Sequence, residues 1–190
     1  CLSKHQDNVE IKLFKYIDKI EKAIKENPPD VLGFSNYAWN RRVGLEIFRI
    51  FKKNNPKGIT VWGGPNFPLD LESQEIFMKK HPEVDVYVPV EGEVGFSNLV
   101  GKILEKNDKD EIFKNPIEGC IIRDKQGSLQ YSNPGIRIKS LDEIPSPYTS
   151  GLLDEFFDGK LSPMLQTNRG CPFSCSFCVD GSDIVRQVNN

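Results

Sequence analysis

Apolar and polar positions follow two different patterns along the first hundred residues. Four segments repeat apolar residues at the three- and four-residue spacing of an amphipathic helix, namely 7–26, 41–53, 72–80 and 96–104. Between them lie three short and nearly continuous apolar runs, 30–35, 58–63 and 84–88. Runs of this kind are typical of strands that are buried on both faces. The alternation therefore predicts an α/β fold with a parallel sheet and helices on both of its faces.

Ligands of such sheets bind beyond the carboxyl ends of the strands. The residues to inspect are therefore those that follow the three predicted strands, 35–37, 63–66 and 89–93. The candidate binding residues among them are Ser35 and Asn36, then Gly63, Gly64 and Pro65, then Glu91, Gly92 and Glu93. Glycine in these loops permits close approach of the backbone to a bulky ligand, although Gly63–Pro65 alone is also an ordinary turn pattern. For the two glutamates, capping of the next helix or a bond to a cofactor edge is favoured over acid–base catalysis.

Composition narrows the class of protein. The 190 residues carry a net charge of −2, with 38% hydrophobic and 27% charged residues, which is ordinary for a globular chain that buries a core. No basic excess supports wholesale binding of a nucleic-acid backbone, so no nucleic-acid partner is expected. No apolar run approaches the ~20 residues of a membrane span, and no signal-peptide pattern is present. Three of the five cysteines lie close together, which suits a reducing cytoplasm better than a disulfide scaffold.

Those three cysteines, Cys171, Cys175 and Cys178, are separated by three and then two residues. Thiolates at this spacing can hold three irons of a cubane [4Fe–4S] cluster and leave the fourth iron open to a small molecule. A zinc site is the alternative, but it usually shows a fourth cysteine or histidine in paired units. His5 and His81 are far away in sequence and have polar neighbours, so both are expected on the solvated surface. Cys120 alternates with apolar residues and is expected in the core.

The cysteine loop resembles the signature of the radical S-adenosylmethionine (SAM) superfamily, C-x3-C-x-aromatic-C, with Phe177 as the aromatic residue. The resemblance implies that the cluster binds SAM at its open iron, that Phe177 contacts SAM, and that reductive cleavage of SAM yields a 5′-deoxyadenosyl radical. It also implies an electron donor such as flavodoxin or ferredoxin.

The order of the upstream pieces is similar to the cobalamin-binding branch of that superfamily. These pieces are Pro29–Ser35, Val61–Pro65, Val84–Tyr87 and Glu91–Glu93, followed by the Arg-Gly-Cys-Pro of the cysteine loop. The resemblance implies a flavodoxin-like B12 domain, here incomplete, whose post-strand residues named above contact cobalamin. The Asp-x-His-x-x-Gly motif that ligates cobalt in some B12 proteins does not occur, so nothing argues for a histidine ligand to cobalt. Trp39 and the following arginines could face a corrin ring, but they fit the exposed start of a helix better.

The resemblance divides the chain into three parts. Residues 1–115 are expected to form the partial B12-type domain. Residues 116–160 are expected to form a hairpin and linker, with a glycine turn between 119–123 and 128–131, prolines in 141–147 and a short helix at 151–157. Residues 161–190 are expected to begin the radical SAM barrel, with its first strand at 163–168 delivering the cluster loop. The first residue is Cys1 and little follows Cys178, so a fragment of a longer enzyme, inactive by itself, is expected.

The function implied by the resemblance is cobalamin-dependent methyl transfer to a small-molecule substrate, although cyclisation and ring contraction also occur in the family. One rival is a radical SAM protein whose first domain has lost B12. Another is a non-catalytic regulatory module that binds cobalamin or a metal. The cysteine loop argues against the second rival, because sensing cobalamin requires no cluster with an open iron.

Overall fold

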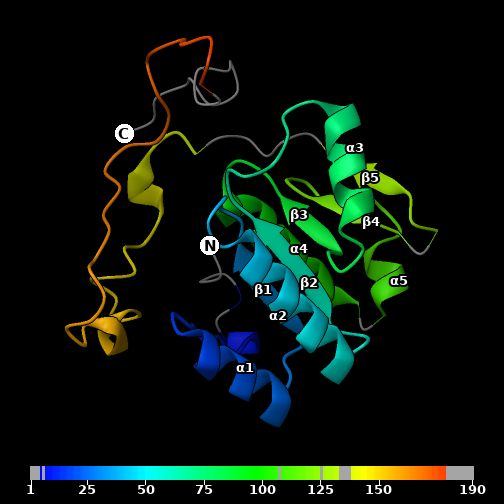
Figure 1. Cartoon of the computed structure of the whole chain (residues 1–190), viewed down its shortest axis with the longest axis horizontal. Coiled ribbons are helices and arrows are strands. Elements are labelled where there is room, and N and C mark those ends of the chain that lie inside the picture. Colours follow the sequence, from blue (N-terminus) through cyan, green and yellow to red (C-terminus); the bar gives the residue numbers. More distant parts are fainter. Residues whose placement is uncertain (1–4, 6, 107, 125, 133–137, 179–190) are drawn as a thin grey trace. The chain divides into compact units, whose positions relative to one another are not determined.

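The computed structural model describes residues 5, 7–106, 108–124, 126–132 and 138–178 (Figure 1). The chain forms two compact units, Cys1–Ile136 and Arg137–Asn190. In the described part of the first unit, strands β1 to β5 form one sheet in sequence order. None of the helices in the described ranges is long and apolar enough to span a membrane.

The first three strands are parallel, as the alternating pattern predicts. They are β1 (Val31–Ser35), β2 (Ile59–Gly63) and β3 (Val86–Val88). Val61 of β2 lies opposite Gly33 of β1 and Val86 of β3, so the three carboxyl ends meet at one edge of the sheet. This edge is called the carboxyl edge below, and the opposite one the amino edge.

The predicted hairpin belongs to the same sheet, which corrects its placement in a separate linker. Strands β4 (Ile121–Arg123) and β5 (Leu129–Tyr131) pair antiparallel, and β4 pairs antiparallel with β3. The physical reason is burial, since Ile121 and Ile122 point to opposite faces of β4 and both are buried. A strand that is apolar on both faces requires a sheet with cover on each side.

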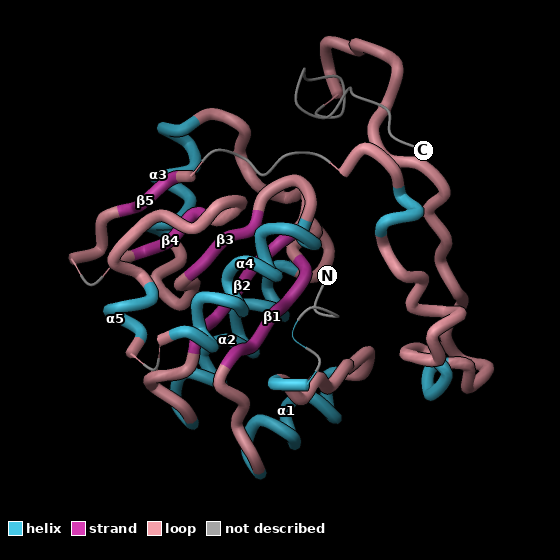
Figure 2. The backbone as a smooth tube through the Cα atoms, turned by 180° about the vertical axis from the view of Figure 1, so that it is seen from behind, coloured by secondary structure: helices cyan, strands magenta, loops and turns pink. Residues whose placement is uncertain are grey.

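Helices cover both faces of this sheet, as Figures 1 and 2 show from opposite sides. One core layer joins α1 (Ile17–Glu26), α2 (Arg41–Asn54) and α3 (Leu71–Lys80) to side chains such as Trp62 and Tyr87. The other layer joins α4 (Gly92–Glu105) and α5 (Lys109–Ile112) to side chains such as Val61 and Val86. The period-two alternation along β2 and β3 thus divides the apolar residues between two layers.

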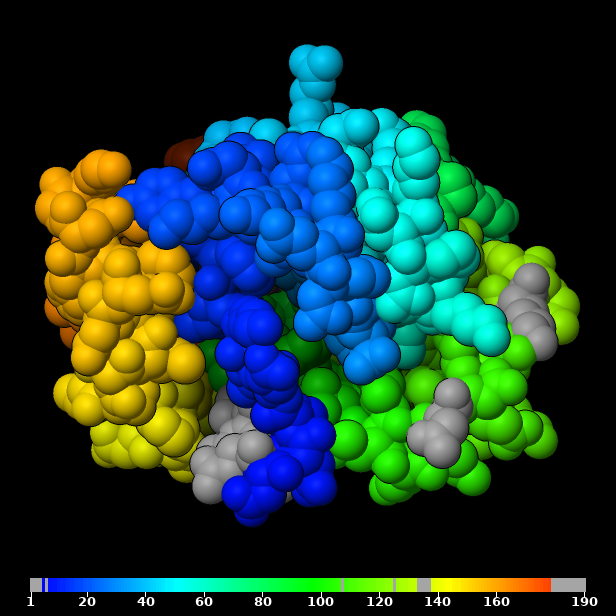
Figure 3. Space-filling view, turned by 90° about the horizontal axis from the view of Figure 1, so that it is seen from below, coloured from blue at the N-terminus to red at the C-terminus, as the bar shows by residue number. Residues whose placement is uncertain are grey.

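Helix α1 is shorter than the sequence pattern predicts, because it begins at Ile17 and not at residue 7. Phe14 nevertheless packs against the first core layer from a segment that is not helical. His5 is half-buried, and its Nε2 lies 3.2 Å from the carbonyl oxygen of Ser97 in α4, so the expectation of a solvated histidine is wrong. In the space-filling view, this N-terminal segment (blue) borders the green part of the chain that contains α4 (Figure 3).

The second unit contains little regular structure in its described residues. It has 3₁₀ turns at Leu141–Glu143 and Asp154–Phe156, so the helix predicted at 151–157 is reduced to a single turn. The strand predicted at 163–168 is not a strand. Instead, Tyr148 Oη donates to the carbonyl oxygen of Met164 at 2.8 Å and accepts from its N–H at 3.1 Å. No residue between 138 and 178 is buried, so this part lacks a core that could hold a strand in a layer.

Candidate functional site

The loops after β1, β2 and β3 meet at the carboxyl edge, where the sequence predicts a binding site. The backbone N–H of Asn36 donates to the Gly63 carbonyl oxygen at 2.5 Å, and the Asn66 N–H donates to the Asn36 carbonyl oxygen at 3.2 Å. Tyr87 of β3 donates its hydroxyl hydrogen to the Gly64 carbonyl oxygen at 2.7 Å. The structure therefore brings the first two groups of predicted residues into direct contact and ties them to β3.

The predicted residues differ in how accessible they are. Ser35 and Pro65 are exposed, and Gly63 and Gly64 are half-buried, so these can be reached by a ligand at the edge. Asn36 is fully buried at 0% exposure. Its side chain therefore cannot be a direct contact in this conformation, although it lies at the centre of the site.

The third group of predicted residues forms the start of α4. Glu91 occupies the N-cap position, but its side chain makes no capping hydrogen bond, and Glu93 lies in the first helical turn. Acidic residues at a helix N-terminus interact favourably with the helix dipole. Gly92 is exposed and has open space around its Cα, which leaves room for a ligand beside the helix start. Just before it, Val90 adopts a φ of 60°, a left-handed conformation that is unusual for a β-branched residue.

An exposed aromatic pair follows β1 at the same edge. The rings of Tyr37 and Trp39 stack with centroids 4.6 Å apart and an interplanar angle of 13°. The Tyr37 N–H donates to Asn40 Oδ1 at 2.8 Å, and Asn40 Nδ2 donates to Ser35 Oγ at 3.0 Å, which fixes the turn that carries the pair into α2. Trp39 is 79% exposed, so a large flat apolar surface is available beside the predicted binding residues.

The predicted cluster loop lies in the second unit, where all three of its cysteines are free thiols. The Cys178 N–H donates to the Cys175 carbonyl oxygen at 3.1 Å across a turn that contains Phe177. Within the described ranges, no three His, Cys, Asp or Glu side chains are grouped so as to hold a metal ion. The donor set itself, three thiols on one accessible loop, fits three irons of a cubane cluster. Phe177 is 92% exposed. Its contact with SAM stays a prediction.

The comparisons with known proteins bear on the first unit most directly. Residues 4–100 match the sequence model of the B12 binding domain. The chain belongs to the B12 binding domain family. The matched residues include β1, β2, β3 and the three loops of the carboxyl edge. This confirms the family resemblance that the order of the sequence motifs indicates.

The relatives of this chain include two methyltransferases, each about one-third identical to it in sequence. It is 34% identical over 168 residues to a 2-(S-pantetheinyl)-carbapenam-3-carboxylate methyltransferase from Streptantibioticus cattleyicolor, which covers 85% of this chain and 24% of the relative. It is 35% identical over 161 residues to the cobalamin-dependent radical SAM methyltransferase TokK of Streptomyces tokunonensis, covering 81% and 22%. A more distant relative, at 25% identity, is the anaerobic magnesium-protoporphyrin IX monomethyl ester cyclase of Synechocystis, covering 78% and 28%. The chain spans about a quarter of the length of these relatives.

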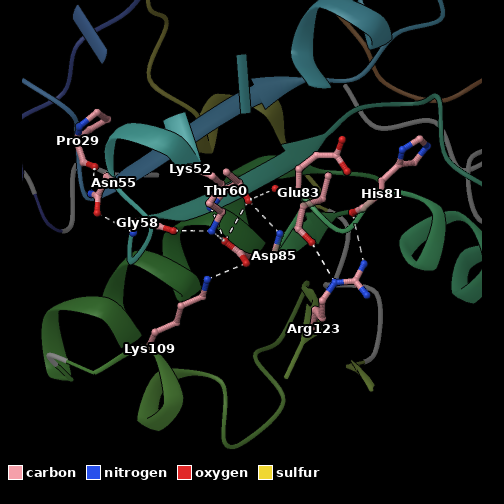
Figure 4. Close-up of polar contacts among 11 residues, drawn as sticks. Pro29, Lys52, Asn55, Gly58, Thr60, His81, Glu83, Asp85, Lys109 and Arg123 are labelled. Atoms are coloured by element: carbon pink, nitrogen blue, oxygen red, sulfur yellow. Dashed lines mark hydrogen bonds and ion pairs between the residues drawn. The ribbon is translucent and has the colours of Figure 1, made fainter. Parts of the chain in front are cut away.

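The B12 binding domain chain carries a second polar cluster at the amino edge, shown in Figure 4. Asp85, just before β3, forms ion pairs with Lys52 of α2 and with Lys109 of α5, the latter at 2.7 Å. The same carboxylate accepts from the Thr60 N–H at 2.9 Å and the Thr60 hydroxyl at 3.0 Å. Burial alone would raise the pKa of Asp85, but the ammonium groups of Lys109 and Lys52 outweigh it and hold the pKa below its usual value.

This amino-edge cluster fastens elements together and lies away from the predicted cofactor residues. A pocket of about 440 Å³ beside it is lined by Lys109, Arg123 and Gln130 among others, so it is also at the amino edge. Arg123 Nε donates to the Val84 carbonyl oxygen at 3.4 Å, and its guanidinium also contacts the carbonyl oxygens of Met78 and His81 at the end of α3. Neither the cluster nor the pocket belongs to the edge where ligands of parallel sheets bind.

Two further sequence expectations are decided by packing. Cys120 is buried with its Sγ 3.3 Å from the Gly95 carbonyl oxygen, and burial raises the pKa of its thiol to about 12, which confirms a core residue. His81 is half-buried, with its ring edge-on to Trp62 at 5.7 Å and close to Phe77 at 4.8 Å. The expectation of a solvated histidine is therefore wrong here too, and burial lowers the pKa of His81.

Sequence reasoning places Asn66 in the loop after the second predicted strand, but it missed Tyr87 as a member of the carboxyl-edge site. Tyr87 lies in an apolar run and therefore resembles a core residue, which it also is, at 0% exposure. A signal was nevertheless present in the period-two alternation, because Asp85 and Tyr87 fall on one face of a buried strand. Polar atoms on a buried face require hydrogen-bond partners, and Tyr87 finds its partners in the loops after β1 and β2.

Proposed function

We propose that this chain is part of a cobalamin-dependent radical SAM enzyme, and that its reaction is methyl transfer to a small-molecule substrate. The observation that carries the proposal is the combination, in one chain, of a B12 binding domain match over residues 4–100 and a C-x3-C-x-Phe-C loop at Cys171–Cys178. Similarity to methyltransferases supports the choice of reaction. Because the chain spans about a quarter of these relatives, the activity and substrate of the whole protein belong to the proposal.

The carboxyl edge of β1–β3 would hold cobalamin. Gly63, Gly64 and Pro65 would let the backbone approach the corrin, since glycine removes the side chain that would otherwise separate them. The stacked Tyr37–Trp39 pair would supply a flat apolar surface for the ring or its side groups. Ser35, Gly92 and the two glutamates at the start of α4 would offer polar contacts to its amide groups. These roles rest on their shared position at one edge of the sheet.

The cysteine loop would hold the cluster through Cys171, Cys175 and Cys178, with Phe177 placed to contact SAM. When bound, the cluster and SAM supply radical chemistry while cobalamin carries the transferred group. The chain's own residues would bind and orient these groups and keep water away from them. An external electron donor would be required, and a flavodoxin or ferredoxin fits that need.

The experiment uses the complete protein of the reading frame that contains this chain, reconstituted anaerobically with iron, sulfide and cobalamin. After gel filtration, SAM consumption and product mass are measured with candidate small-molecule substrates and a low-potential reductant. The proposal predicts retained corrin absorption and a product heavier by one methyl group. Methyl transfer should vanish in Cys171→Ala and persist in Cys120→Ala, because Cys120 lies outside the cluster motif.

Other results would count against parts of the proposal. SAM turnover with retained corrin but without a methylated product would reject methyl transfer and favour a rearrangement or cyclisation. Turnover without retained corrin would reject the cobalamin site. Stoichiometric zinc without iron would reject the cluster, and the enzyme assignment with it.

A further inference from the structure

Asn36 is fully enclosed at the carboxyl edge, with 0% of its surface exposed. Its side-chain Nδ2 donates to the Asn66 carbonyl oxygen at 2.7 Å and to the Tyr87 hydroxyl at 3.2 Å. Its Oδ1 accepts from Asn66 Nδ2 at 3.0 Å. Three of the four hydrogen-bonding positions of this amide are therefore satisfied inside the protein.

The backbone of Asn36 is held just as closely by the loop after β2. Its N–H donates to the Gly63 carbonyl oxygen, and its carbonyl oxygen accepts from the Asn66 N–H. Gly64 has a φ of 123°, and a Cβ at this position would lie 2.7 Å from the Asn36 carbonyl oxygen. Only glycine permits this approach, so the turn at Gly63–Gly64 is wrapped tightly around Asn36.

Tyr87 completes the arrangement from β3. Its hydroxyl donates to the Gly64 carbonyl oxygen at 2.7 Å while it accepts from Asn36. The Phe67 ring stacks on the Tyr87 ring with centroids 3.7 Å apart and an interplanar angle of 13°, which fixes the direction of the hydroxyl. Burial raises the pKa of Tyr87 far above its usual value, so the hydroxyl keeps its hydrogen and remains a donor.

These contacts set the direction of the peptide groups in the turn. The carbonyl oxygens of Gly63 and Gly64 both point into the protein, toward Asn36 and Tyr87. No peptide bond in the described residues is cis. In a trans peptide the N–H points opposite to the carbonyl, so the Gly64 N–H points away from Asn36. The network thus fixes the orientation of the peptide groups at Gly63 and Gly64.

We infer that Asn36 and Tyr87 are positioning residues of the proposed cobalamin site, which fix the Gly63–Gly64 turn in its binding shape without touching the ligand. This inference rests on the proposed function, and it changes the part assigned to Asn36 from a direct contact to a support. Asn66 belongs to the same support, because it bonds Asn36 through both its backbone and its side chain.

The test is Tyr87→Phe in the complete reconstituted protein. This change keeps the aromatic ring and its stacking with Phe67, and it removes only the hydroxyl that bonds Gly64 and Asn36. A buried carbonyl without its donor favours other shapes of the turn, so the dissociation constant for cobalamin should rise about ten-fold. The EPR spectrum of bound cobalt(II) should shift as well, because the surroundings of the corrin change.

Thr60→Val is the matched control. It also removes one buried hydroxyl from the first unit, but at the amino edge, where Thr60 bonds Asp85 and the Glu83 carbonyl oxygen. Both variants should lose stability to thermal unfolding. Only Tyr87→Phe should lose cobalamin affinity and shift the EPR spectrum, when both are measured well below their melting temperatures.

Each outcome decides the inference. Wild-type affinity in Tyr87→Phe, or equal loss of affinity in both variants, would overturn it and leave the proposed function intact. A wild-type protein that binds no cobalamin would overturn the proposed function and the inference together. If Tyr87→Phe does not fold, Asn66→Ala replaces it. That variant removes the donor to Asn36 Oδ1 and should weaken binding about three-fold, whereas unchanged binding would overturn the inference.

Discussion

The two units of this chain differ in how their apolar side chains are used. In the first unit, Phe48, Trp62 and Tyr87 are fully buried between the sheet and its helices. In the described part of the second unit, Met164 is 84% exposed and Phe177 is 92% exposed. Burial of apolar surface is the dominant favourable contribution to folding. The first unit therefore has its own source of stability, and residues 138–178 do not.

The two proposed cofactor sites therefore differ in how far they are organised before a cofactor binds. The carboxyl edge is organised before any ligand arrives, because a buried amide and a buried hydroxyl fix its central turn. The cysteine loop has only a few local hydrogen bonds, such as that between Cys178 and Cys175. Binding of metal to such a loop supplies folding free energy as well as chemistry. We therefore expect the carboxyl edge to be preformed for cobalamin, and the cysteine loop to become ordered when its cluster binds.

Hydrogen exchange gives the largest contrast. Amides in β1, β2 and β3 should exchange at least ~100-fold more slowly than amides between 138 and 178, because only the former require unfolding of a packed core. Mass spectrometry of the cofactor-free chain measures both regions in one sample. Equal protection of the two regions would show that the second unit has a stabilising core.

The next largest effect is expected at Asp85, which holds the amino edge of the first unit together. Asp85→Asn should lower the free energy of unfolding at pH 7 by about 3 kcal/mol, since two half-buried lysines lose the buried carboxylate that pairs with both of them. The native pKa of Asp85 is depressed, so its contribution is present above the unfolded pKa and is lost as the pH falls from about 4 downward. The variant should lack this acid-dependent loss, which chemical denaturation at several pH values measures.

Glu75→Gln is the control for that experiment. Glu75 pairs with Lys79 at 2.6 Å, but both side chains are at least half exposed. Exposed pairs contribute less than about 1 kcal/mol. A loss in Glu75→Gln as large as that in Asp85→Asn would contradict the assignment of stability to the buried cluster.

A pair of glycines with positive φ compares the two units directly. Gly64→Ala should cost about 2 kcal/mol or more, because its Cβ would collide with Asn36 in addition to the unfavourable φ. Gly159 has a φ of 78° and open space around it. Gly159→Ala should leave the main unfolding transition unchanged within about 0.3 kcal/mol, because residue 159 lies outside the core that unfolds. Similar losses in both variants would mean that the units unfold together.

The smallest effect is expected at Val90, beside the predicted cobalamin residues. Its φ of 60° is strained for a β-branched side chain that is 40% exposed and packs little. Val90→Gly should therefore raise the free energy of unfolding by about 1 kcal/mol. Val90→Ala retains Cβ and should gain less. Destabilisation by Val90→Gly in thermal unfolding would show that the valine side chain contributes more packing than its exposure indicates.

The sequence predicts the first unit well where periodicity and burial agree. Helix α2 and strand β2 lie within one or two residues of their predicted ranges, because Phe48, Phe51 and Trp62 are core residues of strongly patterned segments. The prediction is wrong where apolar residues at helical spacing pack on the core without forming a helix. Phe14 extends the helical spacing upstream of α1, but packs on the core from a non-helical segment.

The sequence predicts where the candidate site lies, but not which residues hold its loops in place. The rule for parallel sheets places Ser35, Gly63 and Gly64 at one edge, and the structure agrees. That rule cannot tell that Asn36 points inward, or that Tyr87 reaches it from β3, because both depend on hydrogen bonds between distant segments. The strand predicted at 163–168 fails for a related reason, since a strand needs neighbours that the described part of the second unit does not contain.

The proposal of two cofactors in one enzyme is tested most directly by an anaerobic spectrum of the complete protein after reconstitution with iron, sulfide and cobalamin. Visible absorption and reduced-state EPR are recorded with and without SAM. We expect retained corrin bands and a cubane EPR signal that changes on addition of SAM, is lost in Cys171→Ala and is kept in Cys120→Ala. A preparation with no cubane signal, or with a signal that changes neither on addition of SAM nor in Cys171→Ala, would contradict the assignment of the cysteine loop to a SAM-binding cluster.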